Sequence, residues 1–221
     1  MPMRRVRVKI CGITRLEDIY ASVRAGADAL GFVVDVPSSP RNLTLEKAKH
    51  LMRATPIFIG KIVVTVFRSI EHANKICEEL RPDAIQIHGN LVPAEYMREI
   101  SRLVPVIGAI SVPLEKPFEE IQSHIGLFDA VLVDSRVPGT YGGTGVVHDW
   151  SVSRRIRDAI YPKPLILAGG LRPENVVEAI LRVKPFAVDV SSGVEISPGV
   201  KDEHRILSFI EEVRRAEMCL S

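Results

Sequence analysis

The side chain with the clearest potential for chemistry is Cys11, in the stretch VKICGITR at residues 8–15. It ends an apolar run and stands directly before a glycine. A thiol that loses its proton can act as a nucleophile or a general base. Most buried cysteines are only small hydrophobic residues, and Cys77, on an apolar helical stripe, fits that interpretation. Cys219 is near the C-terminus. A catalytic role for Cys11 therefore depends on where its strand ends.

Four other polar side chains stand at or just after the ends of apolar runs. Asp134 ends the run AVLVD, where partial burial would raise its pKa and suit it to general acid catalysis. Asp189 and His88 also end apolar runs, and Arg41 follows one in SPRNL, where an arginine can bind a carboxylate through two hydrogen bonds. Each has a plainer interpretation as well: loop-capping carboxylates, a core histidine and a solvated arginine.

Three glycine-rich segments are candidates for binding phosphate: GGTG at 142–145, GG at 169–170 and SSG at 191–193. Glycine lets the backbone approach an anion closely, and converging N–H groups hold phosphate. Singly, each segment is typical of a tight turn, but together they favour a phosphorylated ligand. The candidate phosphate-binding residues are Gly143, Gly145, Gly169, Gly170, Ser191, Ser192 and Gly193.

The elements that would position these residues alternate between short apolar runs and helical patterns. The predicted strands are 6–11, 28–34, 57–66, 84–88, 105–111, 129–134, 165–168 and 187–190. The predicted helices are 15–25, 44–54, 70–80, 93–103, 116–124, 149–160, 173–183 and 202–214. Thr14 and Glu17 have the spacing of a capping box at the start of the first helix.

Eight strand–helix units require parallel strands joined by helical crossovers. We therefore predict a closed (β/α)8 TIM barrel, with an open doubly wound sheet as the alternative. No linker or low-complexity tract interrupts the sequence, so residues 1–221 are predicted to form a single domain. In such a barrel the active site lies at the carboxyl ends of the strands, where Cys11, Asp134 and the glycine segments fall.

Alternation along the strands predicts which side chains face the barrel interior. One set of alternating residues, called here the polar parity, is mostly polar. It consists of Lys9, Cys11, Gln86, His88, Asp189 and Ser191, together with Ala187. The apolar parity of the same strands consists of Val8, Ile10, Ile85, Ile87, Val188 and Val190. If the apolar parity packs against the helices, the polar groups point into the barrel.

Composition excludes several classes of function. The net charge of +2 is small and its basic residues are dispersed, which argues against nucleic acid as a partner. The most apolar window, 57–67, is too short to span a bilayer and contains Lys61, so no membrane association is expected. The three cysteines lack the spacing of a zinc site or a redox pair, and no secretory signal is visible, which favours the cytoplasm. The sequence leaves the oligomeric state open between a monomer and a homodimer.

A series of segments, in order along nearly the whole chain, resembles the phosphoribosylanthranilate isomerase family of the tryptophan pathway. They are VKICGIT, GADALGFV, SPR, IQIHG, LVDS, GGTG, DW, AGGL followed by PENV, and PFAVDVSSGVE followed by PG and KD. The resemblance implies an Amadori rearrangement of N-(5-phosphoribosyl)anthranilate to 1-(o-carboxyphenylamino)-1-deoxyribulose 5-phosphate, a small phosphosugar, without cofactor or metal.

The resemblance also implies roles for individual residues. Cys11 matches the family's general base and Asp134 its general acid. Arg41 matches an arginine that contacts the anthranilate carboxylate, and His88 and Asp189 match residues that line the site. The segments 169–170 and 191–193 match the phosphate cradle, and 142–145 matches the loop over the substrate.

Two kinds of rival function fit the sequence less well: a different phosphosugar enzyme and a barrel without catalysis. Indole-glycerol-phosphate synthase would place a catalytic lysine at a strand end, and the histidine-pathway isomerase would have an aspartate at position 11. A barrel that has lost catalysis and serves only for binding or assembly would be expected to lack the acid or the base. The sequence has both, at matching positions.

Overall fold

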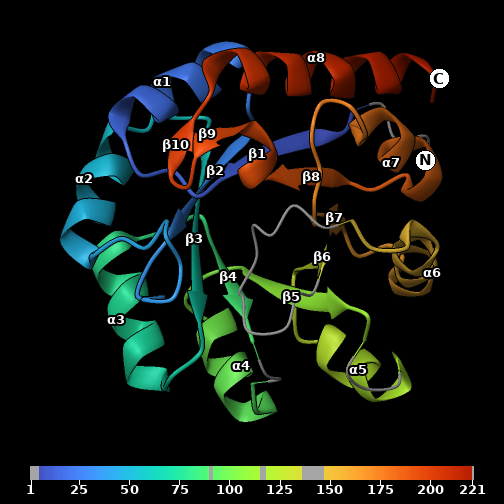
Figure 1. Ribbon diagram of the computed structural model, residues 1–221. Coiled ribbons are helices and arrows are strands. Elements are labelled where there is room, and N and C mark those ends of the chain that lie inside the picture. The colour runs from blue at the N-terminus through green and yellow to red at the C-terminus, as the bar shows by residue number, and fades with distance from the viewer. Residues whose placement is uncertain (1–4, 90–91, 115–117, 136–146, 221) are drawn as a thin grey trace.

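Eight parallel strands, β1 to β8, form a closed barrel in sequence order in the computed structural model, which describes residues 5–89, 92–114, 118–135 and 147–220 (Figure 1). β8 pairs with β1 and closes the barrel. The strands are β1 (Arg7–Cys11), β2 (Ala29–Val33), β3 (Gly60–Val66), β4 (Ala84–His88), β5 (Val106–Val112), β6 (Ala130–Ser135), β7 (Leu165–Leu167) and β8 (Ala187–Val190). The predicted (β/α)8 TIM barrel is confirmed, and the open sheet is wrong.

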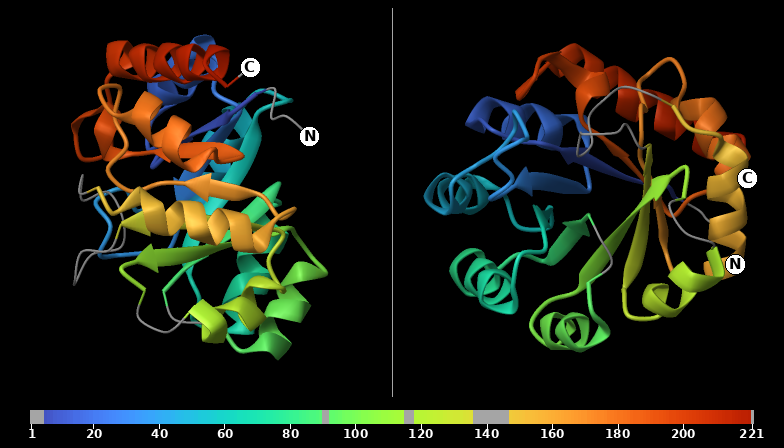
Figure 2. Two further views of the ribbon diagram at one scale, coloured as in Figure 1. Left: turned by 90° about the vertical axis from the view of Figure 1, so that its right-hand side faces the viewer. Right: turned by 60° about the horizontal axis from the view of Figure 1, so that its bottom comes forward.

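A ring of helices surrounds the barrel (Figure 2). α8 packs between α7 and α1 and so joins the last helix of the ring to the first. The helices are α1 (Leu16–Ala25), α2 (Leu45–Ala54), α3 (Ile70–Leu80), α4 (Ala94–Ser101), α5 (Phe118–Ile125), α6 (Trp150–Ile160), α7 (Val176–Val183) and α8 (Glu203–Met218). Over the described ranges, no helix is both long and apolar enough to cross a membrane.

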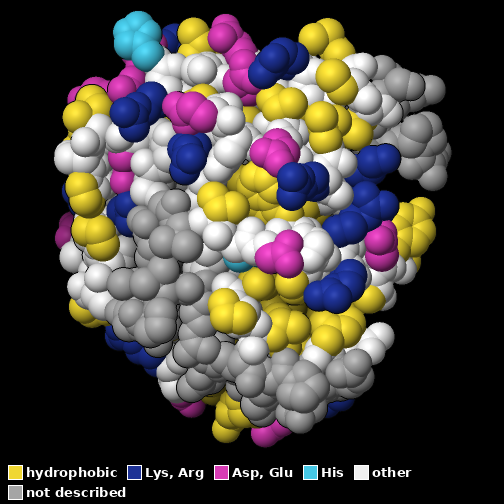
Figure 3. Space-filling model, turned by 45° about the vertical axis from the view of Figure 1, so that its right-hand side comes forward, with side chains coloured by type: hydrophobic (Ala, Val, Ile, Leu, Met, Phe, Trp, Pro, Cys, Tyr) yellow, Lys and Arg dark blue, Asp and Glu magenta, His cyan; other side chains and the backbone are white. Residues whose placement is uncertain are grey.

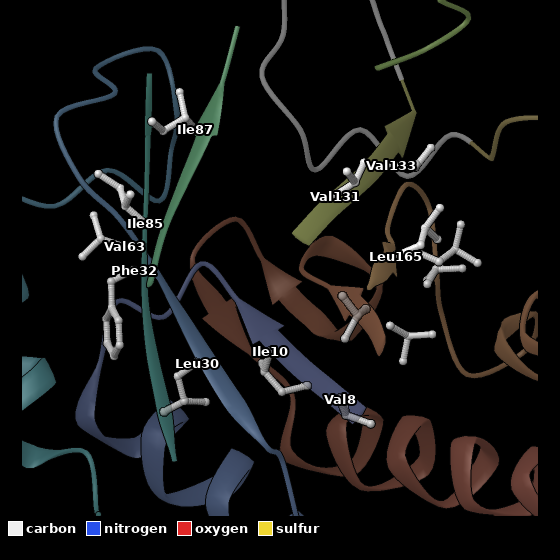
Figure 4. Packing of buried hydrophobic residues seen from close by; sticks show 14 of the residues in the cluster. Val8, Ile10, Leu30, Phe32, Val63, Ile85, Ile87, Val131, Val133 and Leu165 are labelled. Atoms are coloured by element: carbon white, nitrogen blue, oxygen red, sulfur yellow. The ribbon is translucent and has the colours of Figure 1, made fainter. Parts of the chain in front are cut away.

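The predicted parity of the strands is confirmed. The apolar side chains Val8, Ile10, Ile85 and Ile87 belong to the large core between strands and helices, and Figure 4 shows them pointing away from the barrel axis. A second cluster fills the barrel interior below the mouth. It consists of Ile62, Ala84, Ile107, Leu132, Ile166, Ala168 and Ala187. The barrel is therefore a packed core, and only its mouth is open to a ligand.

Aspartates at the amino end of the barrel tie neighbouring strands together. Asp28 Oδ2 accepts a hydrogen bond from Val8 N at 2.9 Å, and Asp129 Oδ2 accepts one from Val106 N at 2.7 Å. Each aspartate directly precedes a strand and satisfies an N–H group of the strand before it. Carboxylates at this end of the barrel serve stability, in keeping with the division of labour in such folds.

The structure departs from the sequence prediction in several places. β3 begins at Gly60, because Ile57 and Phe58 turn outward and are 81% and 97% exposed. The capping box is wrong: α1 begins after Arg15 without a side-chain cap, and the Thr14 hydroxyl donates to Gly199 O at 2.5 Å. The sequence reading also missed a short antiparallel hairpin after β8.

That hairpin consists of β9 (Glu195–Ser197) and β10 (Val200–Lys201), and it is preceded by a single 3-10 turn, η1 (Ser192–Val194). It lies over the end of the barrel beside β1 and β8 (Figure 1). Its sequence EISPGVK contains a Pro-Gly dipeptide between two extended pairs, which is a usable turn signal. The hairpin matters because two of its charged side chains face the barrel mouth.

Candidate active site

One cavity at the carboxyl ends of the strands gathers most of the residues singled out in the sequence. Its empty volume is about 710 Å³, including space open to solvent, which is within the range of small-molecule sites. β1, β4, β6 and β8 contribute to it, as do the loops after β2 and β7. The predicted residues that line it are Cys11, Arg41, His88, Asp134, Gly169, Gly170, Asp189, Ser191 and Ser192.

Cys11 lies at the carboxyl end of β1 and is 7% exposed. Its neighbour on β2 is Gly31, and a Cβ atom there would come within 2.7 Å of Cys11 Sγ and 3.0 Å of Lys9 Nζ. Glycine at position 31 therefore provides the space that the thiol and the ammonium group share. Burial raises the pKa of the Cys11 thiol, and the nearby Lys9 charge works against that increase.

Gly31→Ala is expected to lower kcat strongly and to lower the free energy of unfolding only moderately. The added methyl group must displace Cys11 Sγ or Lys9 Nζ, and overpacking of this kind costs about 1–3 kcal/mol. We expect kcat to fall about tenfold or more, because small displacements of reacting groups are costly. Steady-state kinetics and thermal unfolding would measure both effects. Gly60→Ala is the control, since its new Cβ would come no closer than 3.2 Å to a neighbour; equal losses in both variants would contradict the explanation.

Lys9 and Asp189 form an ion pair inside the barrel, with Lys9 Nζ 2.8 Å from Asp189 Oδ1. Their side chains are 5% and 9% exposed. Burial by itself would lower the pKa of Lys9, but the charge and hydrogen bond of Asp189 outweigh it and raise that pKa. Lys9 therefore stays charged beside the Cys11 thiol.

Asp134 lies near the carboxyl end of β6, across the mouth from Cys11. Burial and the negative charge of Asp189 raise its pKa to about 6. A hydrogen bond from Ser135 N to Asp134 Oδ1, 2.8 Å long, favours the ionised form and limits that increase. Asp134 thus holds a proton more firmly than an ordinary carboxyl group does.

His88, at the end of β4, is a neutral acceptor in this structure. Gln86 Nε2 donates to His88 Nε2 at 2.6 Å. Burial and the charge of Lys9 lower the pKa of His88 to about 4. An uncharged imidazole at the cavity wall can exchange hydrogen bonds with a ligand without adding a charge.

Arg41, in the loop after β2, is anchored by a residue that the sequence reading did not single out. Its Nε and Nη2 atoms donate to the two carboxylate oxygens of Glu195, at 2.8 and 2.6 Å. Lys201 Nζ donates to Glu195 Oε1 at 2.8 Å. The stem of Arg41 passes over Gly12, where a Cβ atom would be 2.4 Å from Arg41 Cδ. The three charges sum to one positive charge at the edge of the cavity.

Glu195→Gln is expected to destabilise the fold strongly, because Arg41 and Lys201 would lose their buried counter-charge. Removing one partner from a buried ion pair costs about 3–5 kcal/mol. Urea unfolding would measure the loss. The control is Glu178→Gln, which breaks an exposed pair with Arg182 and should cost at most about 1 kcal/mol. A Glu195→Gln effect as small as that of the control would contradict the network.

The described glycine loops differ in what they do. Gly169 and Gly170, after β7, have φ angles of 84° and 64° and line the cavity, as do Ser191 and Ser192 after β8. A Cβ atom on Gly193 would be 1.9 Å from Leu171 O, so this glycine lets the two loops pack together. Gly143 and Gly145 lie outside the described residues.

Fold and cavity define the class to which the protein belongs: (β/α)8-barrel enzymes that work at the carboxyl ends of their strands. The family model for N-(5'-phosphoribosyl)anthranilate isomerase matches residues 8–212. The N-(5'-phosphoribosyl)anthranilate isomerase 1 of Methanosarcina mazei is 44% identical over 232 residues, covering 98% of each chain. The chain therefore belongs to the N-(5'-phosphoribosyl)anthranilate isomerase family. It is an enzyme of tryptophan biosynthesis.

Solved structures agree with this assignment. Phosphoribosyl anthranilate isomerase from Thermotoga maritima is 42% identical, with a TM-score of 0.85, over 95% of this chain and 99% of that one. A second isomerase structure holds reduced 1-(o-carboxyphenylamino)-1-deoxyribulose 5-phosphate. It is 38% identical, with a TM-score of 0.79 over the same shares of the two chains.

Proposed function

We propose that Asp134 is the general acid and Cys11 the general base of an Amadori rearrangement at the barrel mouth. The substrate is N-(5'-phosphoribosyl)anthranilate and the product is 1-(o-carboxyphenylamino)-1-deoxyribulose 5-phosphate. The observation that carries the proposal is that one cavity holds a carboxyl group with a pKa raised to about 6 and a thiol beside a buried ammonium group. The product analogue bound by a relative supports this choice of substrate.

The chemistry assigns one proton to each group. Asp134 donates its proton to the ring oxygen of the sugar, the ring C–O bond breaks, and an open-chain Schiff base forms. The Cys11 thiolate then takes the proton from C2′. The C2′–H electron pair forms the C1′=C2′ bond while the π pair of the protonated Schiff base moves onto nitrogen, which gives an enolamine. Tautomerisation then adds a proton at C1′ and removes the proton of the 2′-hydroxyl group, which gives the ketone. C2′ is oxidised as C1′ is reduced, so the rearrangement is internally balanced.

The pKa values imply that only a small fraction of the enzyme has both groups in the protonation states that the reaction needs. The pKa of Asp134 is raised to about 6, while that of Cys11 lies above the ordinary value for a thiol. Near neutral pH the free enzyme therefore holds mostly a carboxylate and a thiol. The reaction needs the reverse, an acid with its proton and a base without one. The pH dependence of kcat/KM should then rise through about pH 6 and fall only above the raised pKa of Cys11.

Binding of the two anionic ends of the substrate is assigned to two groups of residues. Arg41 would bind the anthranilate carboxylate, because Glu195 occupies only part of its five-donor guanidinium group. His88 and Asp189 would contact the sugar. The phosphate cradle would consist of Gly169, Gly170, Ser191, Ser192 and Gly193; Gly143 and Gly145, which lie outside the described residues, are proposed for the same role.

Other properties belong to the same proposal. The three cysteines are free, which fits a reducing cytoplasm. Residues 1–221 are treated as one domain, and the proposed reaction uses neither cofactor nor metal. Basic and acidic side chains are interspersed over much of the face in Figure 3, which offers little to nucleic acid. The oligomeric state is proposed as monomer or homodimer; the relative from Thermotoga maritima is described as dimeric.

A fluorescence assay tests the function. Phosphoribosylanthranilate is generated in place from anthranilate and phosphoribosyl pyrophosphate by an added phosphoribosyltransferase, with release of pyrophosphate, and its fluorescence is followed after the isomerase is added. We expect rapid loss, with the deoxyribulose phosphate product identified by mass and chromatography. Persistent fluorescence with the folded wild-type protein would exclude the assigned reaction.

A further inference from the structure

We infer that the buried Lys9–Asp189 ion pair is a fixed dipole that sets the proton affinities of Cys11 and Asp134 in opposite directions. Its positive end lies beside the thiol, and its negative end is turned toward the carboxyl group. A thiolate base and a protonated acid are thereby favoured together. The inference deepens the proposed function, on which it rests, and it gives Lys9 a positioning role in the reaction.

The position of Lys9 places the positive end of the pair near Cys11. Lys9 and Cys11 are separated by one residue on β1, so their side chains share the inward face. Cys11 Sγ and Lys9 Nζ both lie close to one point, the position of a Cβ atom on Gly31, at 2.7 and 3.0 Å. The ammonium group is therefore the cation nearest to the thiol along β1.

The order of the strands turns the negative end toward Asp134. Lys9 and Asp189 are directly paired residues of β1 and β8. β8 is followed by β7 and then β6, so Asp189 lies on the side of Lys9 that leads around the barrel to Asp134. Cys11, Asp134 and Asp189 all border the same cavity.

The electrostatic environment of the two groups has the matching asymmetry. After burial, Lys9 is the largest influence on the pKa of Cys11, which it lowers, and the opposing effect of Asp189 is smaller. For Asp134 the order is reversed: Asp189 raises the pKa, and the opposing effect of Lys9 is smaller. The pair as a whole therefore lowers the pKa of the base and raises that of the acid.

Other charged groups face the same two side chains and belong in the comparison. Lys201, on β10, also lowers the pKa of Cys11, and Arg41, in the loop after β2, interacts with Cys11 through its charge. The charge of Lys201 is shared with Glu195. His88, on β4, borders the cavity as a neutral ring. Lys9 and Asp189 together influence both the acid and the base.

The dipole has a measurable kinetic consequence. When the base has the higher pKa, the plateau value of kcat/KM is proportional to a fraction of the enzyme. That fraction is the enzyme in which Cys11 is a thiolate and Asp134 is a carboxylic acid. Each additional pKa unit between the two groups lowers that fraction about tenfold. Removing the dipole should separate the two pKa values further. The bell-shaped pH profile would then become wider and lower at once.

The test is the double variant Lys9→Gln with Asp189→Asn, which removes both charges and leaves a neutral hydrogen-bonded pair. This choice avoids an uncompensated buried charge, which either single change would create. The profile of kcat/KM is measured from about pH 5 to about pH 10 and divided by that of the wild type, which cancels the ionisation of the substrate. The control variant removes the exposed pair Arg24–Glu203 through Arg24→Gln with Glu203→Gln and should leave the profile unchanged.

We expect the acidic limb of the profile to move to lower pH and the alkaline limb to higher pH. The plateau value of kcat/KM should fall about tenfold or more. A lower plateau with unmoved limbs would show that the pair only shapes the cavity and would overturn the inference. The single variants give a second signature. Lys9→Gln should raise the pKa values of both limbs, and Asp189→Asn should lower both pKa values. Any other pattern contradicts the dipole.

A thiol titration separates this inference from the proposed reaction. The pH dependence of Cys11 alkylation by iodoacetamide, followed by mass spectrometry of its peptide, needs no turnover. Its midpoint should be higher in the double variant than in the wild type. If that shift appears in a protein without isomerase activity, the dipole stands and the proposed function fails. An unchanged midpoint in an active enzyme gives the opposite result.

Discussion

Cys11→Ala is expected to lower kcat by about 10²–10⁴-fold, the usual contribution of a general base. Alanine removes the only atom of this side chain that can accept the C2′ proton and preserves the backbone of β1. Cys11→Ser should be nearly as inactive, because a hydroxyl group ionises far less readily than a thiol. Substrate affinity should change little, since the phosphate and carboxylate ends bind elsewhere in the cavity. Single-turnover measurements would separate the chemical step from binding.

Cys77→Ala provides the matched control. Cys77 is also buried, but it lies on α3, and its side chain packs into the core between helices and strands rather than lining the cavity. Its loss should reduce stability modestly and leave kcat near the wild-type value. If Cys11→Ala retained kcat as well, Cys11 would be a packing residue like Cys77, and the base would have to be sought among the other residues of the mouth.

Most of the fold could be predicted because the alternation of strands and helices repeats so regularly. The predicted and observed ranges of α3, β4 and β8 coincide. The errors occur where local sequence does not decide the outcome. Ile57 and Phe58 have the composition of a strand, yet they lie outside the barrel because no neighbouring strand extends to pair with them. Thr14 has the residue type of a cap, but the helix begins after Arg15 instead, and the Thr14 hydroxyl donates to Gly199 O.

The candidate site could be predicted at the level of residue types but not of partners. Parity along β1 placed Lys9 and Cys11 on one inward face. That parity could not show that Lys9 pairs with Asp189, which is 180 positions away in the sequence. In the same way, its place after the second predicted strand singled out Arg41, while its anchor Glu195 lies on a hairpin beyond the last strand. Ion pairs between distant segments depend on how the barrel closes, and a single sequence contains no direct signal for them.

Asp134→Asn should abolish general acid catalysis and change the pH profile in a specific way. We expect kcat to fall by about 10²–10⁴-fold. The wild-type profile rises through about pH 6, the pKa of Asp134, because that group is the first of the two to titrate. Once it is replaced, only Cys11 titrates, so the rising limb should move to the pKa of the thiol, in the alkaline range. A residual activity that still rose through about pH 6 would exclude Asp134 as the acid.

The same variant is expected to be more stable than the wild type at neutral pH. The folded protein raises the pKa of Asp134 from 3.8 to about 6, which at pH 7 corresponds to about 3 kcal/mol of destabilisation from the buried carboxylate. This cost is fully present above the folded pKa and disappears as the pH falls below the unfolded pKa. Urea unfolding should therefore show a gain of about 1–3 kcal/mol near pH 7 that vanishes near pH 4.

Asp129→Asn, at the opposite end of β6, separates this effect from a general benefit of removing a carboxylate. Asp129 accepts a hydrogen bond from Val106 N and belongs to the stabilising end of the barrel. Its replacement should leave kcat unchanged and give no gain in stability at neutral pH. A gain at position 134 alone, together with the loss of activity, would mean that the fold retains an unfavourable buried carboxylate because the reaction needs a firmly held proton there. Equal stability changes at the two positions would contradict that explanation.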